Sequence, residues 1–154
     1  MTEAAWYEGA PIPQLMLDAR GSYGNLARQA LADAGCDDVP ENGGFVLAGL
    51  DDSEFTPQAD AVAGLRRSKQ RSSQLIDTLV LRGYLERRND PEDRRRMSVR
   101  LTERGRIASD AIQSAVDTID AELAKRLTAQ ELHGLRAGLA TLAEIRKQSD
   151  DERV

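Results

Sequence analysis

The side chains best suited to chemistry form a short polar run directly after Ser68: Lys69, Gln70, Arg71, Ser72, Ser73 and Gln74. An apolar stripe of helical spacing follows, at Leu75, Ile76, Leu79 and Val80. The run therefore occupies the start of a predicted helix. When a helix enters the major groove of DNA, its first residues reach base edges, where Gln pairs with adenine and Arg with guanine. Free N–H groups at the helix start also bind phosphate. Residues 68–74 are thus candidates for contact with nucleic acid.

A second cationic cluster is formed by Arg94, Arg95 and Arg96. It ends a turn-forming segment, residues 89–93, with the sequence Asn-Asp-Pro-Glu-Asp. Strand candidates flank this segment at 84–88 and 97–101, the second of which alternates apolar and polar residues. The pattern predicts a hairpin with a basic tip, and arginines on such a tip fit a narrow minor groove.

The distribution of charge supports the same interpretation. The whole chain carries a net charge of −5, yet residues 66–106 contain 13 Lys or Arg and 6 Asp or Glu. A basic segment within an acidic chain suits a protein whose contact face meets a line of phosphates. Charge alone leaves open an Arg-rich surface that is merely solvated.

The elements that must position these residues can be outlined from capping signals. Thr56 and Pro57 predict the start of a helix reaching Leu65, with Thr as cap and Pro at the first helical position. Ser68 is the predicted cap of the next helix, which runs to about Arg82 and is ended by Gly83.

The flanking regions are predicted to be helical. Residues 12–34 form a first helix, with an interruption at 21–24 where two glycines occur, and residues 41–50 form a short second helix. Long apolar stripes at 107–127 and 132–145 indicate two C-terminal helices. Between them, Thr128 and Glu131 have the spacing of a capping box.

The run LIDTLVLRGYLERRNDPEDRRRMSVRLTERGR, residues 75–106, closely resembles the signature of the MarR family of winged helix-turn-helix transcriptional regulators. The matching features are the helix end, the basic-Gly pair, the Pro-x-Asp-Arg-Arg wing and the Leu-Thr-x-x-Gly motif. With the two predicted helix starts before it, the resemblance extends over residues 56–106. It implies a sequence-specific regulator of double-stranded DNA that needs no cofactor or metal.

The resemblance also implies roles for individual residues. Gln70, Arg71, Ser73 and Gln74 would face the major groove, and Arg95 would enter the minor groove or grip its phosphates. Asp77 would pair with Arg95 and brace the wing against the helix, with a solvated carboxylate as the alternative. Leu101, Thr102 and Gly105 would be structural. Gln74 stands where many members have Arg, and Arg66-Arg67 replaces a Gly-apolar pair.

The expected fold is mainly α (α+β): a winged helix-turn-helix with a two-stranded β-wing and N- and C-terminal dimerisation helices. The expected organisation is an N-terminal helical dimerisation segment, a DNA-binding domain, C-terminal dimerisation helices and a frayed tail, at 1–39, 40–104, 105–148 and 149–154 respectively. Uncovered, the C-terminal stripes would form a large apolar patch, so we expect a homodimer that binds a pseudo-palindromic operator.

The sequence also bears on two other classes of function. An enzyme is disfavoured because the chain has one His, His133, one Cys, Cys36, no glycine-rich phosphate loop after a strand and no zinc-ligand spacing. A winged-helix module that binds only proteins remains the alternative, since fold does not fix function.

Expectations also follow for the regulation and the location of the protein. Family members often act as repressors that release DNA when a small aromatic or phenolic anion binds. Trp6, Tyr7, Tyr23 and Phe45 could line such a site, although core or interface roles are favoured for them. Cys36 lies beside acidic residues and is read as a passive thiol. The absence of a signal-like N-terminus or a long apolar run predicts a cytoplasmic protein without a membrane segment.

Overall fold

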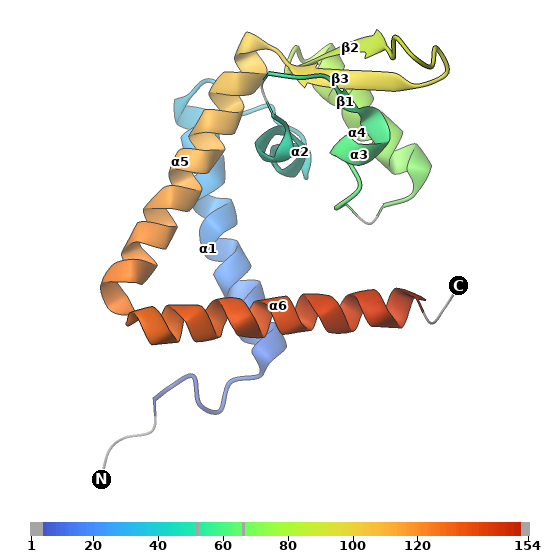
Figure 1. Ribbon diagram of the computed structural model, residues 1–154. Helices are drawn as coiled ribbons and strands as arrows, with labels where there is room; N and C mark the ends of the chain where they lie inside the picture. Colours follow the sequence, from blue (N-terminus) through green and yellow to red (C-terminus); the bar gives the residue numbers. More distant parts are fainter. Residues whose placement is uncertain (1–4, 52, 66, 152–154) are drawn as a thin grey trace. The chain divides into compact units, whose positions relative to one another are not determined.

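The computed structural model describes residues 5–51, 53–65 and 67–151, which form two compact units that divide after Val116. The first unit holds the three-stranded sheet and most of the helices (Figure 1). Within the described residues, no helix is both long and apolar enough to cross a bilayer.

Helix α1, Ile12–Asp33, follows Pro11 and is continuous. The break predicted as one form of interruption at 21–24 is not found. Gly21 and Gly24 lie within the helix, where each costs about 1 kcal/mol relative to Ala without breaking the hydrogen-bond ladder. Helix α2, Gly43–Gly49, confirms the short second helix and buries Val46 and Leu47.

The helix predicted to reach Leu65 is present but much shorter than expected. Thr56–Pro57 form strand β1, and helix α3 covers only Gln58–Ala61. Thr56 pairs with Val99 and Pro57 with Ser98, so the backbone at Thr56 is extended as part of a sheet rather than capping a helix. Pairing with a strand some forty residues away overrides the local capping signal.

Helix α4, Lys69–Leu81, has the predicted bounds within one residue. The Ser68 Oγ accepts a hydrogen bond from the backbone N–H of Arg71 at 3.3 Å, as a helix cap should. Gly83 ends the segment with φ +76°, a left-handed conformation that favours glycine.

Strands β2, Leu85–Asn89, and β3, Met97–Leu101, form the predicted hairpin. They are antiparallel, with Leu85 opposite Leu101 and Asn89 opposite Met97. The strand order β1-β3-β2 makes the sheet three-stranded, one strand more than the sequence indicated. The fold is a winged helix.

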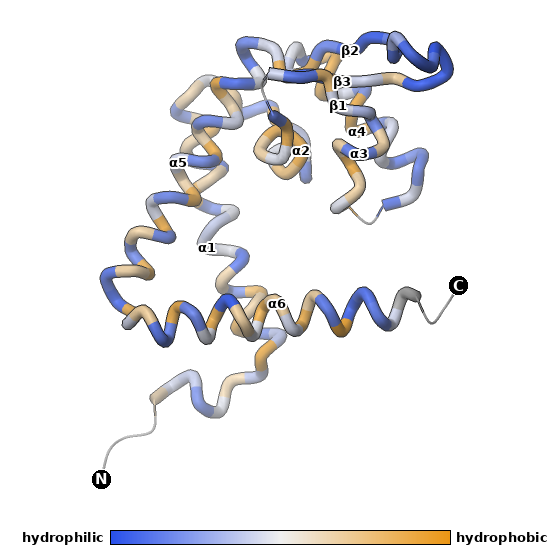
Figure 2. Tube along the Cα trace, in the orientation of Figure 1, coloured by the Kyte–Doolittle hydropathy of each residue, from blue (hydrophilic) through white to orange (hydrophobic). Residues whose placement is uncertain are grey.

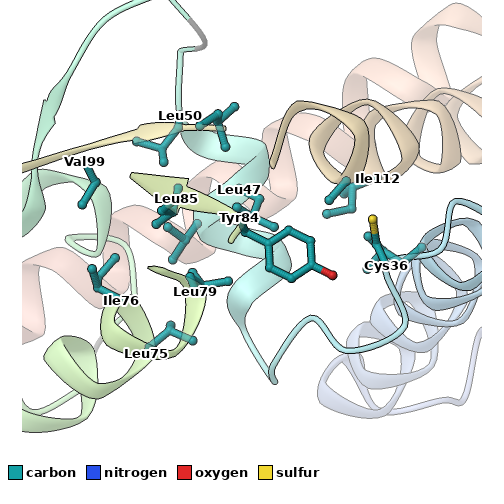
Figure 3. Packing of buried hydrophobic residues seen from close by; sticks show 14 residues of the cluster. Cys36, Leu47, Leu50, Leu75, Ile76, Leu79, Tyr84, Leu85, Val99 and Ile112 are labelled. Atoms are coloured by element: carbon teal, nitrogen blue, oxygen red, sulfur yellow. The ribbon is translucent and has the colours of Figure 1, made fainter. Parts of the chain in front are cut away.

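The core of the first unit combines residues of α1, α2, α4, β2 and β3 (Figure 3). The hydropathy of each residue along the trace is shown in Figure 2. Leu47 from α2, Ile76 and Leu79 from α4, and Val99 from β3 are completely buried. Ala108 and Ile112 bring the first part of helix α5, Glu103–Arg126, into the same cluster. Because α4 and the sheet share this core, the helix and the hairpin are held in one rigid arrangement.

The second unit contains the end of α5 and helix α6, Ala129–Asp151. The capping box is confirmed: the backbone N–H of Thr128 donates to Glu131 at 2.7 Å, and that of Glu131 donates to Thr128 Oγ1 at 3.3 Å. Residues 149–151, expected to belong to a frayed tail, lie in α6, and residues 152–154 of that tail fall outside the described part of the chain.

Candidate nucleic-acid interface

The polar residues predicted at the start of helix α4 differ in their exposure to solvent. Lys69, Gln70, Arg71 and Gln74 are exposed, and Ser73 is half-buried. Ser72, also predicted as a contact residue, is buried, with 8% of its surface accessible. Its position is four residues before Ile76 on the inward face of the helix, so its side chain turns toward the core.

A shallow open depression of about 390 Å³ lies beside the exposed face of α4. Arg67, Arg71, Gln74 and Thr78 form one side of it, together with Leu75, and Pro40 and Glu41 the other. Neither arginine has a carboxylate within ion-pair distance among the residues described, so both cations face this hollow unneutralised. Arg66, noted beside them in the sequence, lies outside the described residues.

The wing loop is shaped by its own acidic residues. The Asp90 Oδ1 accepts the backbone N–H of Glu92 at 2.8 Å, and the Asp93 Oδ1 accepts that of Arg95 at 3.0 Å. The backbone N–H of Asp90 donates to the Arg96 carbonyl at 2.9 Å and closes the loop. These bonds turn Arg94, Arg95 and Arg96 outward, and all three are exposed.

The predicted pairing of Asp77 with Arg95 is replaced by another. Asp77 on α4 forms an ion pair with Arg87 on β2, with 2.5 Å between carboxylate oxygen and guanidinium nitrogen. The partner lies at the base of the wing, directly over the helix, whereas Arg95 is at the tip. The pair still links the helix to the wing, and it leaves Arg95 without a carboxylate partner among the described residues.

The basic segment therefore contains two classes of cation. Five arginines are paired with carboxylates and are partly neutralised: Arg87 with Asp77, Arg96 with Asp93, Arg100 with Glu86, Arg104 with Asp38, and Arg106 with Glu103. Within the described ranges, seven basic residues have no such partner: Arg67, Lys69, Arg71, Arg82, Arg88, Arg94 and Arg95. Arg82, at the C-cap of α4, donates instead to the backbone carbonyl of Asp38. The other six lie on α4, just before it, and along the wing.

An ion-pair cluster that the sequence analysis missed joins the loop after α1 to the winged helix. The Asp38 carboxylate accepts a hydrogen bond from the Tyr84 hydroxyl and pairs with Arg104 at 2.8 Å. Arg104 also stacks over the Tyr84 ring, 4.3 Å from its centroid. The Tyr84 hydrogen bond, helped by Arg104, lowers the pKa of Asp38, while burial and the Asp38 contact raise the pKa of Tyr84. The residues of this cluster are far apart in the sequence, so no local sequence pattern predicts that they come together.

A second missed feature is Phe55, on the face of the sheet that bears Glu86, Arg88 and Arg100. The guanidinium carbons of Arg88 and Arg100 lie 3.7 and 4.5 Å from the centroid of its ring. Glu86 and Arg100 lie opposite each other on β2 and β3 and form an ion pair. Their opposite charges could have indicated this pair from the sequence, but only with the strand register known.

The described ranges contain no candidate metal centre. No group of three or more His, Cys, Asp or Glu side chains there is arranged to hold a metal ion. The Cys36 thiol is buried in the core and donates to the Ala34 carbonyl, with 3.6 Å between sulfur and oxygen.

The sequence of α2 through the wing, residues 45–96, matches the model of the MarR family. No match was found among curated protein sequences.

Solved structures show that the MarR-type fold extends beyond this segment. The S. aureus MepR–DNA complex has a TM-score of 0.72 at 23% identity, covering 87% of this chain and 97% of that one. Streptococcus pneumoniae FabT in complex with DNA has a TM-score of 0.70 at 16% identity, covering 88% and 98%. A crystal structure of MarR has a TM-score of 0.70 at 21% identity, covering 94% and 97%.

Proposed function

We propose that this protein is a transcriptional regulator that binds double-stranded DNA in a sequence-specific manner. The observation that carries the proposal is the placement of the unpaired cations. Arg71, beside Gln74, is exposed on α4, and Arg94 and Arg95 are exposed on the wing, while other arginines of the segment are paired with carboxylates. A helix of this kind fits the major groove, and a basic wing fits the minor groove beside it.

The comparisons support this proposal through what the related structures contain. MepR and FabT, which share the fold, were each solved bound to DNA. In the present chain, Arg71 and Gln74 would read bases, Lys69 and Gln70 would contact bases or phosphates near the helix start, and Arg95 would contact the minor groove. Asp77 would act indirectly, by holding Arg87 and thereby the wing.

We further propose a homodimer on a pseudo-palindromic operator. Over residues 129–149 of helix α6, where burial is described, no side chain is buried, and a stripe of apolar side chains is exposed: Leu135, Leu139, Leu142 and Ile145. Helix α1 exposes Ile12, Met16 and Leu17. Exposed apolar faces of this kind are unfavourable in water, and a second copy of the chain would bury them. Repression, and release of DNA by a small aromatic anion, are proposed from the family resemblance.

The proposal is tested by selecting bound duplexes from a random DNA pool and measuring their affinity for charge-reversal variants. We expect Arg71→Glu and Arg95→Glu each to weaken binding at least about 5-fold, since one such contact is worth about 1–3 kcal/mol. Arg126→Glu is the matched control, because it changes the charge equally on the last turn of α5, where Arg126 pairs with Glu122. If both interface variants bind as the wild type does, the protein-interaction module becomes the better description.

A further inference from the structure

One cation of the wing is both unneutralised and held in place. The Arg88 side chain is exposed, and its guanidinium carbon lies 3.7 Å from the centroid of the Phe55 ring. Such a cation–π contact orients an arginine without supplying a negative charge. No carboxylate within the described residues pairs with Arg88.

Arg100 stacks on the same ring and differs from Arg88 in having a carboxylate partner. Its guanidinium carbon lies 4.5 Å from the Phe55 centroid, yet its Nε and Nη2 donate to Glu86 Oε1 at 2.7 and 2.5 Å. The Glu86 carboxylate thus offsets the charge of Arg100 and occupies two of its donors. Arg88 keeps its full charge and its donors for a partner outside the chain.

The stacking has a consequence for binding. An arginine loses side-chain conformational entropy when it is immobilised, and this loss opposes binding. Because the Phe55 ring already restricts Arg88, part of this entropy is already lost in the free protein. A contact made by Arg88 is then stronger than one made by an arginine that moves freely.

The position of Arg88 indicates what that partner is. It lies opposite Ser98, one residue before the end of β2, and the loop with Arg94 and Arg95 starts at Asp90. Two residues of strand span about 7 Å. Phosphates of one DNA strand recur about every 3.4 Å along the helix axis. A wing tip placed in a groove therefore brings Arg88 beside the adjoining backbone.

We propose that Arg88 is a phosphate-binding residue for duplex DNA, oriented for that contact by Phe55. The proposal rests on the proposed DNA-binding function and adds a residue outside the helix start and the wing tip. The contact is to backbone phosphate, so it contributes affinity and dependence on salt rather than base preference.

The test measures the affinity of the full-length protein for a labelled random-sequence duplex of about 30 base pairs over a series of salt concentrations. We expect Arg88→Gln to reduce the log–log salt slope by about 0.9 for each protomer bound, the value of one lost phosphate contact. Arg88→Lys should retain the slope because it retains the charge. Phe55→Leu should also retain it, while weakening affinity several-fold through loss of the stacking.

The matched control is the double variant Glu86→Gln/Arg100→Gln, which removes the neighbouring pair without changing the net charge and should leave the slope unaltered. An Arg88→Gln slope equal to that of the wild type overturns the role of Arg88 while DNA binding itself stands. A Phe55→Leu affinity equal to that of the wild type overturns the orienting role of the ring. A wild-type protein that does not bind duplex DNA overturns both this inference and the proposed function.

Discussion

At the scale of single residues, close contact determines which side chains can be changed. A Cβ atom at Gly105 would lie 2.1 Å from the Tyr84 carbonyl oxygen. That oxygen cannot easily retreat, because the backbone N–H and the hydroxyl of Thr102 donate to it at 3.0 and 3.1 Å. The glycine of the Leu-Thr-x-x-Gly motif is therefore required by the approach of α5 to the start of β2.

We predict that Gly105→Ala destabilises the protein by about 3 kcal/mol or more, because overpacking against a fixed backbone atom forces the elements apart. The measurement is urea unfolding followed by circular dichroism. Gly134→Ala is the matched control: it lies in α6 with no atom within 4 Å of the added Cβ. It should stabilise by up to about 1 kcal/mol. Equal stability of the Gly105 variant and the wild type would contradict the packing argument.

At the scale of elements, α4 depends on its cap and on its attachment to the sheet. Ser68 provides the cap, and the pair between Asp77 and Arg87 links α4 to β2. An exposed ion pair contributes little to stability, typically 0 to about 1 kcal/mol. Its value here lies in fixing the direction of the wing relative to the helix, while the shared core supplies the stability.

The cap allows stability and DNA binding to be separated at one position. Ser68→Ala should lower the free energy of unfolding by about 1 kcal/mol, and Ser68→Asp should restore it, since Asp is an equally good cap. The aspartate also places a negative charge at the proposed phosphate-facing end of α4. We therefore expect Ser68→Asp to fold like the wild type in urea titrations but to bind duplex DNA more weakly. Undiminished affinity of this variant would argue against contact between the α4 N-terminus and DNA.

At the scale of the whole molecule, exposed apolar surface is the feature that requires a partner. The side chains of Leu139 and Ile145 on α6 are 46% and 54% exposed. An exposed apolar stripe of this kind is stable in water when another apolar surface covers it. The second copy of the chain is the proposed cover.

We predict that Leu139→Glu converts a dimer into a monomer, because a buried unpaired carboxylate opposes association. Light scattering at micromolar concentration measures the change as a halving of mass. Ala137→Glu introduces the same charge about 160° away around the helix, given a rotation of about 100° per residue, and should leave the mass unchanged. A wild-type monomer would rule out the proposed assembly, and loss of mass in both variants would show a general effect of charge on α6.

The sequence by itself determined the features that depend on neighbours a few residues apart. The Ser68 cap, the Gly83 terminus, the capping box at Thr128 and the two wing strands were all predicted, because capping bonds and side-chain periodicity act within about four residues. The family signature likewise indicated the winged helix. Local signals failed where a distant segment competed, as at Thr56, which joins Val99 in a sheet.

The tertiary structure alone decided which cations of the basic segment are available. Whether an arginine faces a carboxylate depends on strand register and on how helices pack, and these bring together Arg104 with Asp38 and Arg87 with Asp77. Burial of Ser72 was decided in the same way, by the face that α4 turns to the core. Charge counted along the chain could not separate paired from unpaired arginines, because ion pairing is a property of distances in space rather than of composition.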